Sequence, residues 1–336
     1  MLSPVEEPRR PLGNTGLTVS PVALGCWPIA GVTTLGTSET DSIATIRACF
    51  KLGINHLDTA HAYGRNGESE ALIRRAVAGR RDEVVIATKC GIRWEGTNYR
   101  NDARPERLRT ECDESLLRLG TDRVELLYLH APDENVPIEE SAGTLHDLMA
   151  AGKTRSVGAS NCTLEQLQAF QVVCPIAAVQ LPYNMLQRGI EARTIPWCRE
   201  QNIAVMVYWP LMKGLLAGKF PRDHEFDARD SRRKYPMYQA DEWHKNQDFL
   251  DRLREVAALS VVRGSPDPAP PTVAQLVIHW TIHQPGITAA LCGAKRPAQI
   301  EEIARAMGWS LTDEQRTLIA AAISDRGAAA SNRAFS

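Results

Sequence analysis

Residues 52–70, LGINHLDTAHAYGRNGESE, contain the pattern that decides the fold. A short apolar run ends at Asp58, a polar segment with two glycines follows, and a helical pattern begins at Glu68. This succession is typical of a strand, a loop and a helix. The carboxylate at the strand end and Tyr63 five residues later leave two interpretations: an ordinary helix-starting loop, or a loop that carries chemistry.

The same strand–loop–helix unit recurs along the chain. Apolar runs of strand length alternate with segments whose apolar residues recur at helical spacing. The expected strands are 21–25, 54–58, 84–89, 124–130, 154–158, 177–181, 204–208 and 287–292, and the expected helices are 39–52, 68–78, 105–119, 138–151, 164–173, 192–200, 272–283 and 297–307. Eight alternating units predict an α/β fold, a closed (β/α)8 TIM barrel. An open doubly wound sheet is the competing arrangement.

Two segments lie outside this repeat. Short strands around Asn14-Thr15-Gly16 predict an N-terminal β-hairpin over residues 10–20, expected at the bottom of the barrel. Residues 209–271 form a long polar insertion after the seventh strand, with a helical stretch at 241–259. Such insertions in barrels usually act as binding loops or lids. We therefore expect one barrel domain over residues 1–336 that contains both the hairpin and a cofactor-binding lid.

Composition restricts the class of protein. A chain of 336 residues with 43% hydrophobic and 24% charged residues can form a large core. The formal net charge of -1 gives no electrostatic reason to expect nucleic acid or an anionic membrane as a partner. The N-terminal MLSPVEEPRRPLG lacks a secretory apolar segment, and no later run approaches the roughly 18 residues of a membrane span. We therefore expect a cytoplasmic protein.

Metal chemistry has little support in the sequence. The eight cysteines are scattered without a Cys-x-x-Cys pair, so reduced core thiols are expected rather than a zinc site or a disulfide framework. A barrel hydrolase with aspartate and histidine as metal ligands is one alternative function. The chain has no His-x-His pair, and Asp58 and His61 are poorly spaced for one metal ion. We therefore expect no metal site.

Three ionisable residues, Asp58, Lys89 and His130, lie at the ends of three successive expected strands. In a closed barrel these strand ends face one cavity, so their side chains are expected to meet. Tyr63 adds a phenol whose proton transfer would be favoured by an ammonium that a carboxylate holds. This set is suited to giving a proton to an oxygen that is becoming an alkoxide, which is one half of carbonyl reduction.

The other half of that reaction needs a hydride. No side chain supplies one, so a nicotinamide cofactor is implied. The G-x-G-x-x-G fingerprint is absent, and residues 214–220, GLLAGKF, lack the spacing and the Ser/Thr of a phosphate-binding Walker loop. The dinucleotide must therefore be bound in another way.

Seven ordered motifs make the chain closely resemble the aldo-keto reductases from about residue 10 to residue 321. They are LGINHLDTAHAYG, ATKCG, ELLYLH, VGASN, VQLPYN, WPLMKGLLAGK and CGAKRPAQIEE. The resemblance implies an NADP-dependent alcohol dehydrogenase-type enzyme that acts on CH–OH donors. Its expected substrates are small aldehydes, ketones or sugars, which it would reduce to alcohols by hydride transfer.

The resemblance also implies residue roles. The catalytic tetrad falls on Asp58, Tyr63, Lys89 and His130, with Tyr63 as general acid. The implied cofactor contacts are Ser160, Asn161 and Gln180 on the carboxamide, Tyr208 on the nicotinamide ring, Trp209, Leu211, Gly214 and Lys219 around the pyrophosphate, and Gly293, Lys295, Arg296, Gln299 and Glu302 at the adenosine end, with Arg229 as an addition. Two cations beside a helix start favour a 2′-phosphate, so NADPH is expected rather than NADH.

Aromatic residues near the expected strand ends are candidates for the substrate pocket. Trp27 follows the first strand, and Trp94 and Tyr99 follow Lys89. An alternative function is a cofactor-binding regulatory subunit, because some members of the same family act as potassium-channel β subunits and segments 209–219 and 292–302 resemble theirs equally well. His130 favours the enzyme, since that branch tends to lack a histidine at this position.

Overall fold

The computed structural model describes residues 7–32, 34–260 and 269–329. Eight parallel strands close into a barrel in the order β10-β11-β12-β3-β4-β5-β8-β9. This closure confirms the expected TIM barrel and excludes the open sheet. The barrel strands are β3 (Val22–Gly25), β4 (His56–Asp58), β5 (Val85–Cys90), β8 (Leu126–Leu129), β9 (Val157–Ser160), β10 (Ile176–Pro182), β11 (Ala204–Tyr208) and β12 (Ala289–Gly293).

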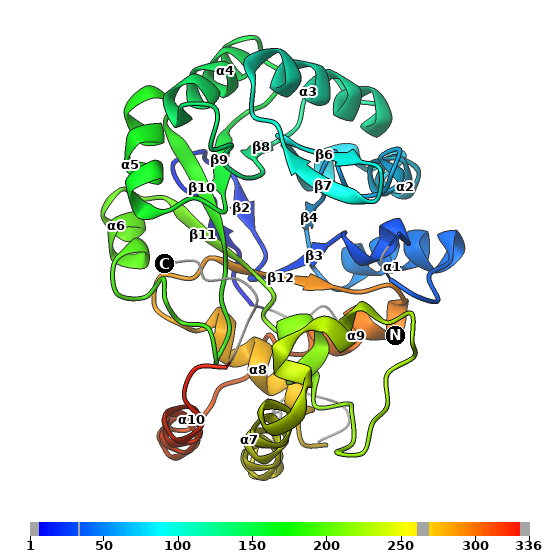
Figure 1. Ribbon diagram of the computed structural model, residues 1–336, viewed down its shortest axis with the longest axis vertical. Helices are drawn as coiled ribbons and strands as arrows, with labels where there is room; N and C mark the ends of the chain where they lie inside the picture. The colour runs from blue at the N-terminus through cyan, green and yellow to red at the C-terminus, as the bar shows by residue number, and fades with distance from the viewer. Residues whose placement is uncertain (1–6, 33, 261–268, 330–336) are drawn as a thin grey trace.

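Helices surround the strands on the outside of the barrel (Figure 1). The helices of the repeat are α1 (Glu39–Lys51), α2 (Glu68–Ala76), α3 (Pro105–Leu119), α4 (Ile138–Ala150), α5 (Leu164–Val173), α6 (Thr194–Glu200), α8 (Val273–Ile282) and α9 (Pro297–Ala304). Each follows a strand, as the periodicity predicted. Within the described ranges, no helix combines the length and apolar character that a bilayer span requires.

The barrel strands are buried on both faces, which explains their continuous apolar runs. Large and small side chains alternate inside. Tyr128 on β8 is fully buried and fills the space beside Gly158 on β9. A Cβ atom at Gly158 would lie 2.4 Å from Tyr128 Cε1, so a residue without a side chain is required at this position.

The N-terminal hairpin covers the bottom of the barrel. Strands β1 (Arg10–Pro11) and β2 (Thr18–Val19) pair antiparallel, which confirms the expected hairpin. Leu12 and Val19 belong to the same buried cluster as the barrel-lining Met206. The Asn55 side chain joins the hairpin to the barrel, because it donates to Thr18 O at 2.8 Å and accepts from the Ser20 N–H at 2.8 Å.

The insertion after β11 contains short 3-10 segments and one long helix. Its elements are η3 (Met212–Ala217), η4 (Ser231–Lys234), η5 (Pro236–Tyr238) and α7 (Ala240–Ala258), and the helix agrees with the expected 241–259. Residues 261–268 of the expected insertion lie outside the described residues. Helix α7 packs beside α10 (Asp313–Arg326) (Figure 1). The largely buried Arg326 side chain of α10 donates to Glu242 Oε2 on α7 at 2.7 Å.

Several further elements were not expected, or have bounds that differ from the expected ones. Strands β6 (Ile92–Glu95) and β7 (Asn98–Asn101) form an antiparallel hairpin between β5 and α3. Helix α10 was missed, and α9 ends at Ala304 rather than at residue 307. The β6–β7 hairpin matters most for function, because it follows a strand end that carries one of the expected catalytic residues.

His279 on α8 is expected to make the fold sensitive to acid. The side chain is 2% exposed, its Nδ1 lies 2.9 Å from Ala306 O, and its ring stacks on Trp309. Burial, and to a smaller extent His283, lowers the pKa of His279 to about 4. Because the folded pKa lies below the ordinary value of 6.5, this contribution is fully present above pH 6.5 and is lost as the pH falls towards 4.

We expect the free energy of unfolding to fall by up to about 3 kcal/mol through this group over that interval. Denaturant titrations of the wild type and of His279→Gln at neutral pH and near pH 4.5 measure the difference. The variant should lose less stability than the wild type on acidification. An identical pH dependence in the two proteins would show that His279 is not responsible.

Candidate active site

The candidate catalytic side chains meet at the carboxyl ends of β4, β5 and β8. Asp58 is the last residue of β4, Lys89 is the penultimate residue of β5, and His130 directly follows β8. Tyr63 lies in the loop between β4 and α2. The structure therefore brings together the residues that the strand-end pattern selected.

The Lys89 ammonium is at the centre of the site. The side chain is fully buried, and its Nζ donates to Asp58 Oδ1 at 2.6 Å, to Thr59 O at 2.6 Å and to the Tyr63 hydroxyl at 3.2 Å. These three contacts use all three donors of an ammonium group. Burial lowers the pKa of Lys89, and the neighbouring Asp58 carboxylate opposes this effect.

The Asp58 carboxylate is held from its other side as well. Gln180 Nε2 donates to Asp58 Oδ2 at 2.7 Å, and both side chains are buried. Tyr128 lies inside the barrel close to this carboxylate, and burial followed by the Asp58 charge raises the pKa of Tyr128 well above its ordinary value. Tyr128 therefore stays a neutral phenol beside the ion pair of Asp58 and Lys89.

His130 lies across the ring of Tyr63. The two ring centroids are 5.8 Å apart at an interplanar angle of 70°. The His130 backbone is held at both ends, since its N–H donates to Cys90 O at 2.8 Å and its carbonyl accepts from Asn161 Nδ2 at 2.8 Å. The imidazole is thereby placed next to the phenol.

The expected carboxamide-binding residues also form one connected group. Asn161 has a left-handed backbone, with φ of 59°. Its side chain joins Ser160 to Tyr208. Its Nδ2 also contacts Ser160 Oγ at 3.1 Å, and its Oδ1 accepts from the Tyr208 hydroxyl at 2.7 Å. Asn161, Ser160, Tyr208 and Gln180 therefore lie together at the ends of β9, β10 and β11.

The backbone after β11 turns sharply where a pyrophosphate was expected. Trp209, Met212, Lys213 and Gly214 have φ angles of 60°, 44°, 57° and 96°. Left-handed backbone at non-glycine residues costs free energy and is concentrated at ligand clamps and active sites. The Lys213 ammonium lies 4.2 Å from the ring centroid of Trp209, and Leu211 leads into the η3 turn. Lys219 forms an ion pair with Glu302, which links this segment to α9.

The cations expected at the adenosine end lie at the start of α9. Lys295 Nζ donates to Leu35 O, and Arg296 Nη2 donates to Gly36 O at 3.4 Å. Gln299 accepts the Lys295 N–H at 2.9 Å, which closes the turn before the helix. At Gly293 a Cβ atom would lie 2.8 Å from Pro28 Cγ, so the chain there passes close to the segment after β3.

Arg229 has a different environment from these cations. Its guanidinium donates to both carboxylate oxygens of Asp227, at 3.0 and 2.9 Å, and the pair is exposed. Arg232 lies closer to these cations in its effect. Burial, then the charge of Arg296 and then the charge of Arg232 lower the pKa of Lys295. Arg232 itself is half-buried against Phe220.

An aromatic wall lies beside Tyr63. The ring centroid of Trp27 is 5.1 Å from that of Tyr63 and 5.7 Å from that of Tyr99. Trp94 packs on Tyr99 at 3.9 Å, and its Nε1 donates to Gly64 O at 2.8 Å. The β6–β7 hairpin therefore brings its two aromatic residues to the loop that carries Tyr63.

Two groups at the site were not found from the sequence. Thr59 O binds the Lys89 ammonium through its backbone, and no side-chain pattern reveals a carbonyl contact. Tyr128 is part of the apolar run of β8, where its hydroxyl gives no signal of its own. As for metals, the described part of the chain has no group of three or more His, Cys, Asp or Glu side chains that could hold an ion.

Comparison with known proteins agrees with this geometry. Residues 21–324 match the Aldo/keto reductase family. The chain belongs to this family. As an aldo-keto reductase it is an oxidoreductase, and members of the family use nicotinamide cofactors. The family assignment confirms the resemblance that the seven motifs carried.

Relatives and solved structures cover almost the whole of this aldo-keto reductase. Aldo-keto reductase YhdN of Bacillus subtilis (strain 168) is 35% identical over 320 residues, 94% of each chain. The NADH-specific methylglyoxal reductase of Escherichia coli (strain K12) is 31% identical over 92% of this chain and 96% of its own. The glycerol dehydrogenase AKR11B4 of Gluconobacter oxydans is 34% identical, with a TM-score of 0.84 and 95% of each chain covered.

Proposed function

We propose that this protein reduces small aldehydes or ketones, sugars included, to alcohols with NADPH, and that Tyr63 is the general acid. The observation that carries the proposal is the buried chain of contacts from Asp58 through Lys89 to the Tyr63 hydroxyl. An ammonium 3.2 Å from a phenol stabilises the phenolate that remains after proton donation. Few structural roles require a fully buried lysine in contact with a tyrosine hydroxyl.

Each residue of the proposed tetrad has a separate task. Tyr63 gives its proton to the carbonyl oxygen as that oxygen gains charge. Lys89 stabilises the resulting phenolate, and Asp58 holds Lys89 in the charged form against the effect of burial. His130, whose ring lies 5.8 Å from that of Tyr63, orients the substrate oxygen. The nicotinamide, when bound, supplies the hydride.

The residues present fit a nicotinamide dinucleotide. Ser160, Asn161 and Gln180 offer amide and hydroxyl groups for the carboxamide, and Tyr208 offers a ring face. The left-handed backbone after β11 offers N–H groups for a pyrophosphate, with Lys219 beside it. We assign Trp209, Leu211 and Gly214 to this clamp and regard residues 209–271 as the lid of a single barrel domain.

Gly293, Lys295, Arg296, Gln299 and Glu302 would hold the adenosine end of the cofactor. Two cations at the start of α9 favour a 2′-phosphate by charge and by the helix dipole. Arg229 would contribute after release from Asp227. The aromatic wall of Trp27, Trp94 and Tyr99 supports a substrate with an apolar face.

We expect the double substitution Lys295→Ala/Arg296→Ala to lower NADPH affinity by about 100-fold and NADH affinity by less than about 3-fold, because only NADPH carries the 2′-phosphate. Dissociation constants from titration of the reduced cofactors measure both values. Arg305→Ala, which removes an exposed positive charge from the other end of α9, is the matched control. An unchanged ratio of the two affinities would overturn the preference for NADPH, which matters because one relative is described as NADH-specific.

The test of the proposed function is oxidation of NADPH and NADH in the presence of a panel of aldehydes, ketones and sugars. Turnover with at least one carbonyl compound supports the enzyme. Tight cofactor binding without turnover across the panel favours the alternative, a cofactor-binding regulatory subunit. Cofactor titration in the same samples separates that result from a protein that binds no cofactor.

A further inference from the structure

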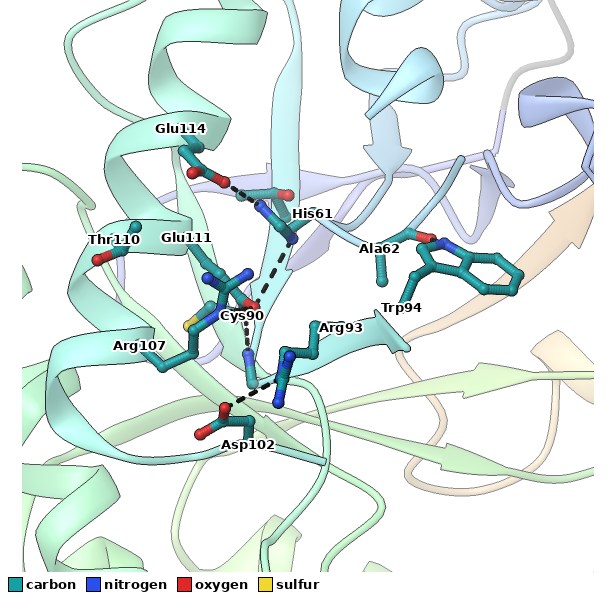
Figure 2. Close-up of polar contacts among 12 residues, drawn as sticks. His61, Ala62, Cys90, Arg93, Trp94, Asp102, Arg107, Thr110, Glu111 and Glu114 are labelled. Carbon is teal, nitrogen blue, oxygen red and sulfur yellow. Dashed lines mark hydrogen bonds and ion pairs between the residues drawn. The ribbon is translucent and has the colours of Figure 1, made fainter. Parts of the chain in front are cut away.

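Helix α3 contacts both chain segments that bear the proposed proton-transfer groups. Its buried residue Glu111 accepts the Gly91 N–H at Oε2, at 2.6 Å, and the Arg107 Nε–H at Oε1, at 2.8 Å (Figure 2). Gly91 lies two residues after Lys89 and has φ of 98°, so the chain turns there and presents its N–H to the carboxylate. Glu111 thereby ties the carboxyl end of β5 to the helix.

The second segment is the loop before Tyr63. His61 Nδ1 lies 3.8 Å from Glu111 Oε1, and its Nε2 lies 2.6 Å from Glu114 Oε2 on the next turn of α3 (Figure 2). The His61 N–H donates to Lys89 O at 3.0 Å, so the loop and the strand end are also joined directly. One face of α3 therefore holds the loop of Tyr63 and the strand end of Lys89 together.

We propose that Glu111 is a positioning residue: it fixes the strand end of Lys89 on α3, the helix whose Glu114 binds the loop of Tyr63, and thereby sets the relative placement that proton donation requires. This inference rests on the proposed function of Tyr63. The hydroxyl and the ammonium are only 3.2 Å apart, and they come from a loop and from a strand end. Misplacement of reacting groups by about 1 Å can cost about 100-fold in rate. A carboxylate anchored on a helix reduces that misplacement.

The charge of Glu111 supports a role beyond stability. Burial raises the pKa of Glu111 to about 7, against the lowering effects of the Gly91 N–H and Arg107. A raised folded pKa means that ionised Glu111 costs stability: the favourable contribution of the protonated form is full below about pH 4.5 and is lost as the pH rises to 7. Side chains whose functional protonation state lowers the stability of the fold, as ionised Glu111 does, are concentrated at functional sites.

The groups that face Glu111 determine which side chain of this cluster is protonated first when the pH falls. They are Arg107 on the same helix, His61 from the loop after β4, Asp102 at the start of the segment before α3, and the Cys90 thiol. Burial lowers the pKa of His61 to about 4. Acidification below pH 7 therefore protonates Glu111 before His61, and the charge-assisted bond to Gly91 weakens.

The chain contains a matched control for this contact. Glu125 is also a largely buried carboxylate that binds a backbone N–H of β5, since Oε2 accepts from Ile86 at 2.9 Å, and it is also paired with an arginine, Arg81. Ile86 is at the opposite end of β5, away from the site. Glu111→Gln and Glu125→Gln therefore remove the same charge from the same kind of contact, at the two ends of one strand.

We expect Glu111→Gln to lower kcat by about 10-fold or more, with cofactor affinity unchanged, and to remove an acid limb near pH 7 from the kcat profile. Glu125→Gln should change neither. Glu111→Asp keeps the charge but is one methylene shorter, so it should retain the acid limb at a reduced kcat. The melting temperature of each variant, measured in parallel, shows whether the fold is intact.

Amide hydrogen exchange tests the same proposal without turnover. Exchange in residues 59–64 and 89–92 should become faster in Glu111→Gln and stay unchanged in Glu125→Gln. If the two variants behave alike in exchange and kcat, or if exchange in both segments is unaffected by Glu111→Gln, Glu111 is not a positioning residue. If the wild type turns over no carbonyl compound, the proposed function fails, and the exchange comparison still decides the positioning role.

Discussion

Replacement of Tyr63 by phenylalanine should lower kcat for carbonyl reduction by about 10³-fold. The phenyl ring can still pack against Trp27 at the observed centroid distance of 5.1 Å, so the wall of the site is preserved. What is lost is the hydroxyl that contacts the Lys89 ammonium and that would give a proton to the substrate oxygen.

Single-turnover measurements at saturating cofactor report this step, and cofactor titration should give an unchanged dissociation constant. Tyr99→Phe is the matched control, because it removes a hydroxyl from a neighbouring tyrosine of the same aromatic wall. It should retain kcat within about 3-fold. If Tyr63→Phe keeps more than a tenth of the wild-type kcat, or if both variants lose the same factor, Tyr63 is not the general acid.

The second large effect is expected at the buried ion pair. Lys89→Met removes the ammonium that balances the buried Asp58 carboxylate at 2.6 Å. An uncompensated buried charge costs about 3–5 kcal/mol of stability, and kcat should fall by about 10²-fold or more, since the phenolate of Tyr63 loses its stabilising ammonium. The variant therefore loses both stability and activity.

The double variant Lys89→Met/Asp58→Asn separates the two effects. It removes both charges of the pair, and the carbonyl oxygen of the introduced amide can still accept the bond from Gln180. We expect it to recover most of the lost free energy of unfolding while kcat stays as low as in Lys89→Met. Denaturant titration and kcat measured on the three proteins provide the comparison. A double variant no more stable than the single one would contradict this account of the pair.

The barrel was predictable because parallel strands buried on both faces leave continuous apolar runs in the sequence. Helix starts were equally visible, as at Thr163, whose hydroxyl accepts the Gln166 N–H in a capping box. The β6–β7 hairpin was missed because its two strands have only four residues each: the alternation in β6 is too short to stand out, and β7 is polar except for Tyr99 and exposed throughout. Helix α10 was missed although Thr312 and Gln315 form the same capping box.

The grouping of the site was predictable only in part. Asp58, Lys89 and His130 were found because each ends a strand, and a closed barrel brings strand ends together. The role of Glu111 could not be predicted in this way. Glu111 contacts Gly91 and His61 through the tertiary packing of α3, and no local spacing in the sequence encodes that packing. The Lys219–Glu302 pair is of the same kind, since Lys219 lies in the insertion after β11 and Glu302 lies on α9.

Under the proposed function, the eight buried cysteines have a consequence for the way the protein withstands aldehydes. Aldehydes are electrophiles, and thiolates are among the protein nucleophiles that they attack. Burial raises the pKa of every one of these thiols above its ordinary value. Under the proposed function, the folded chain thus offers its own substrates almost no reactive sulfur, and its thiols are protected from aldehydes for as long as the barrel stays closed.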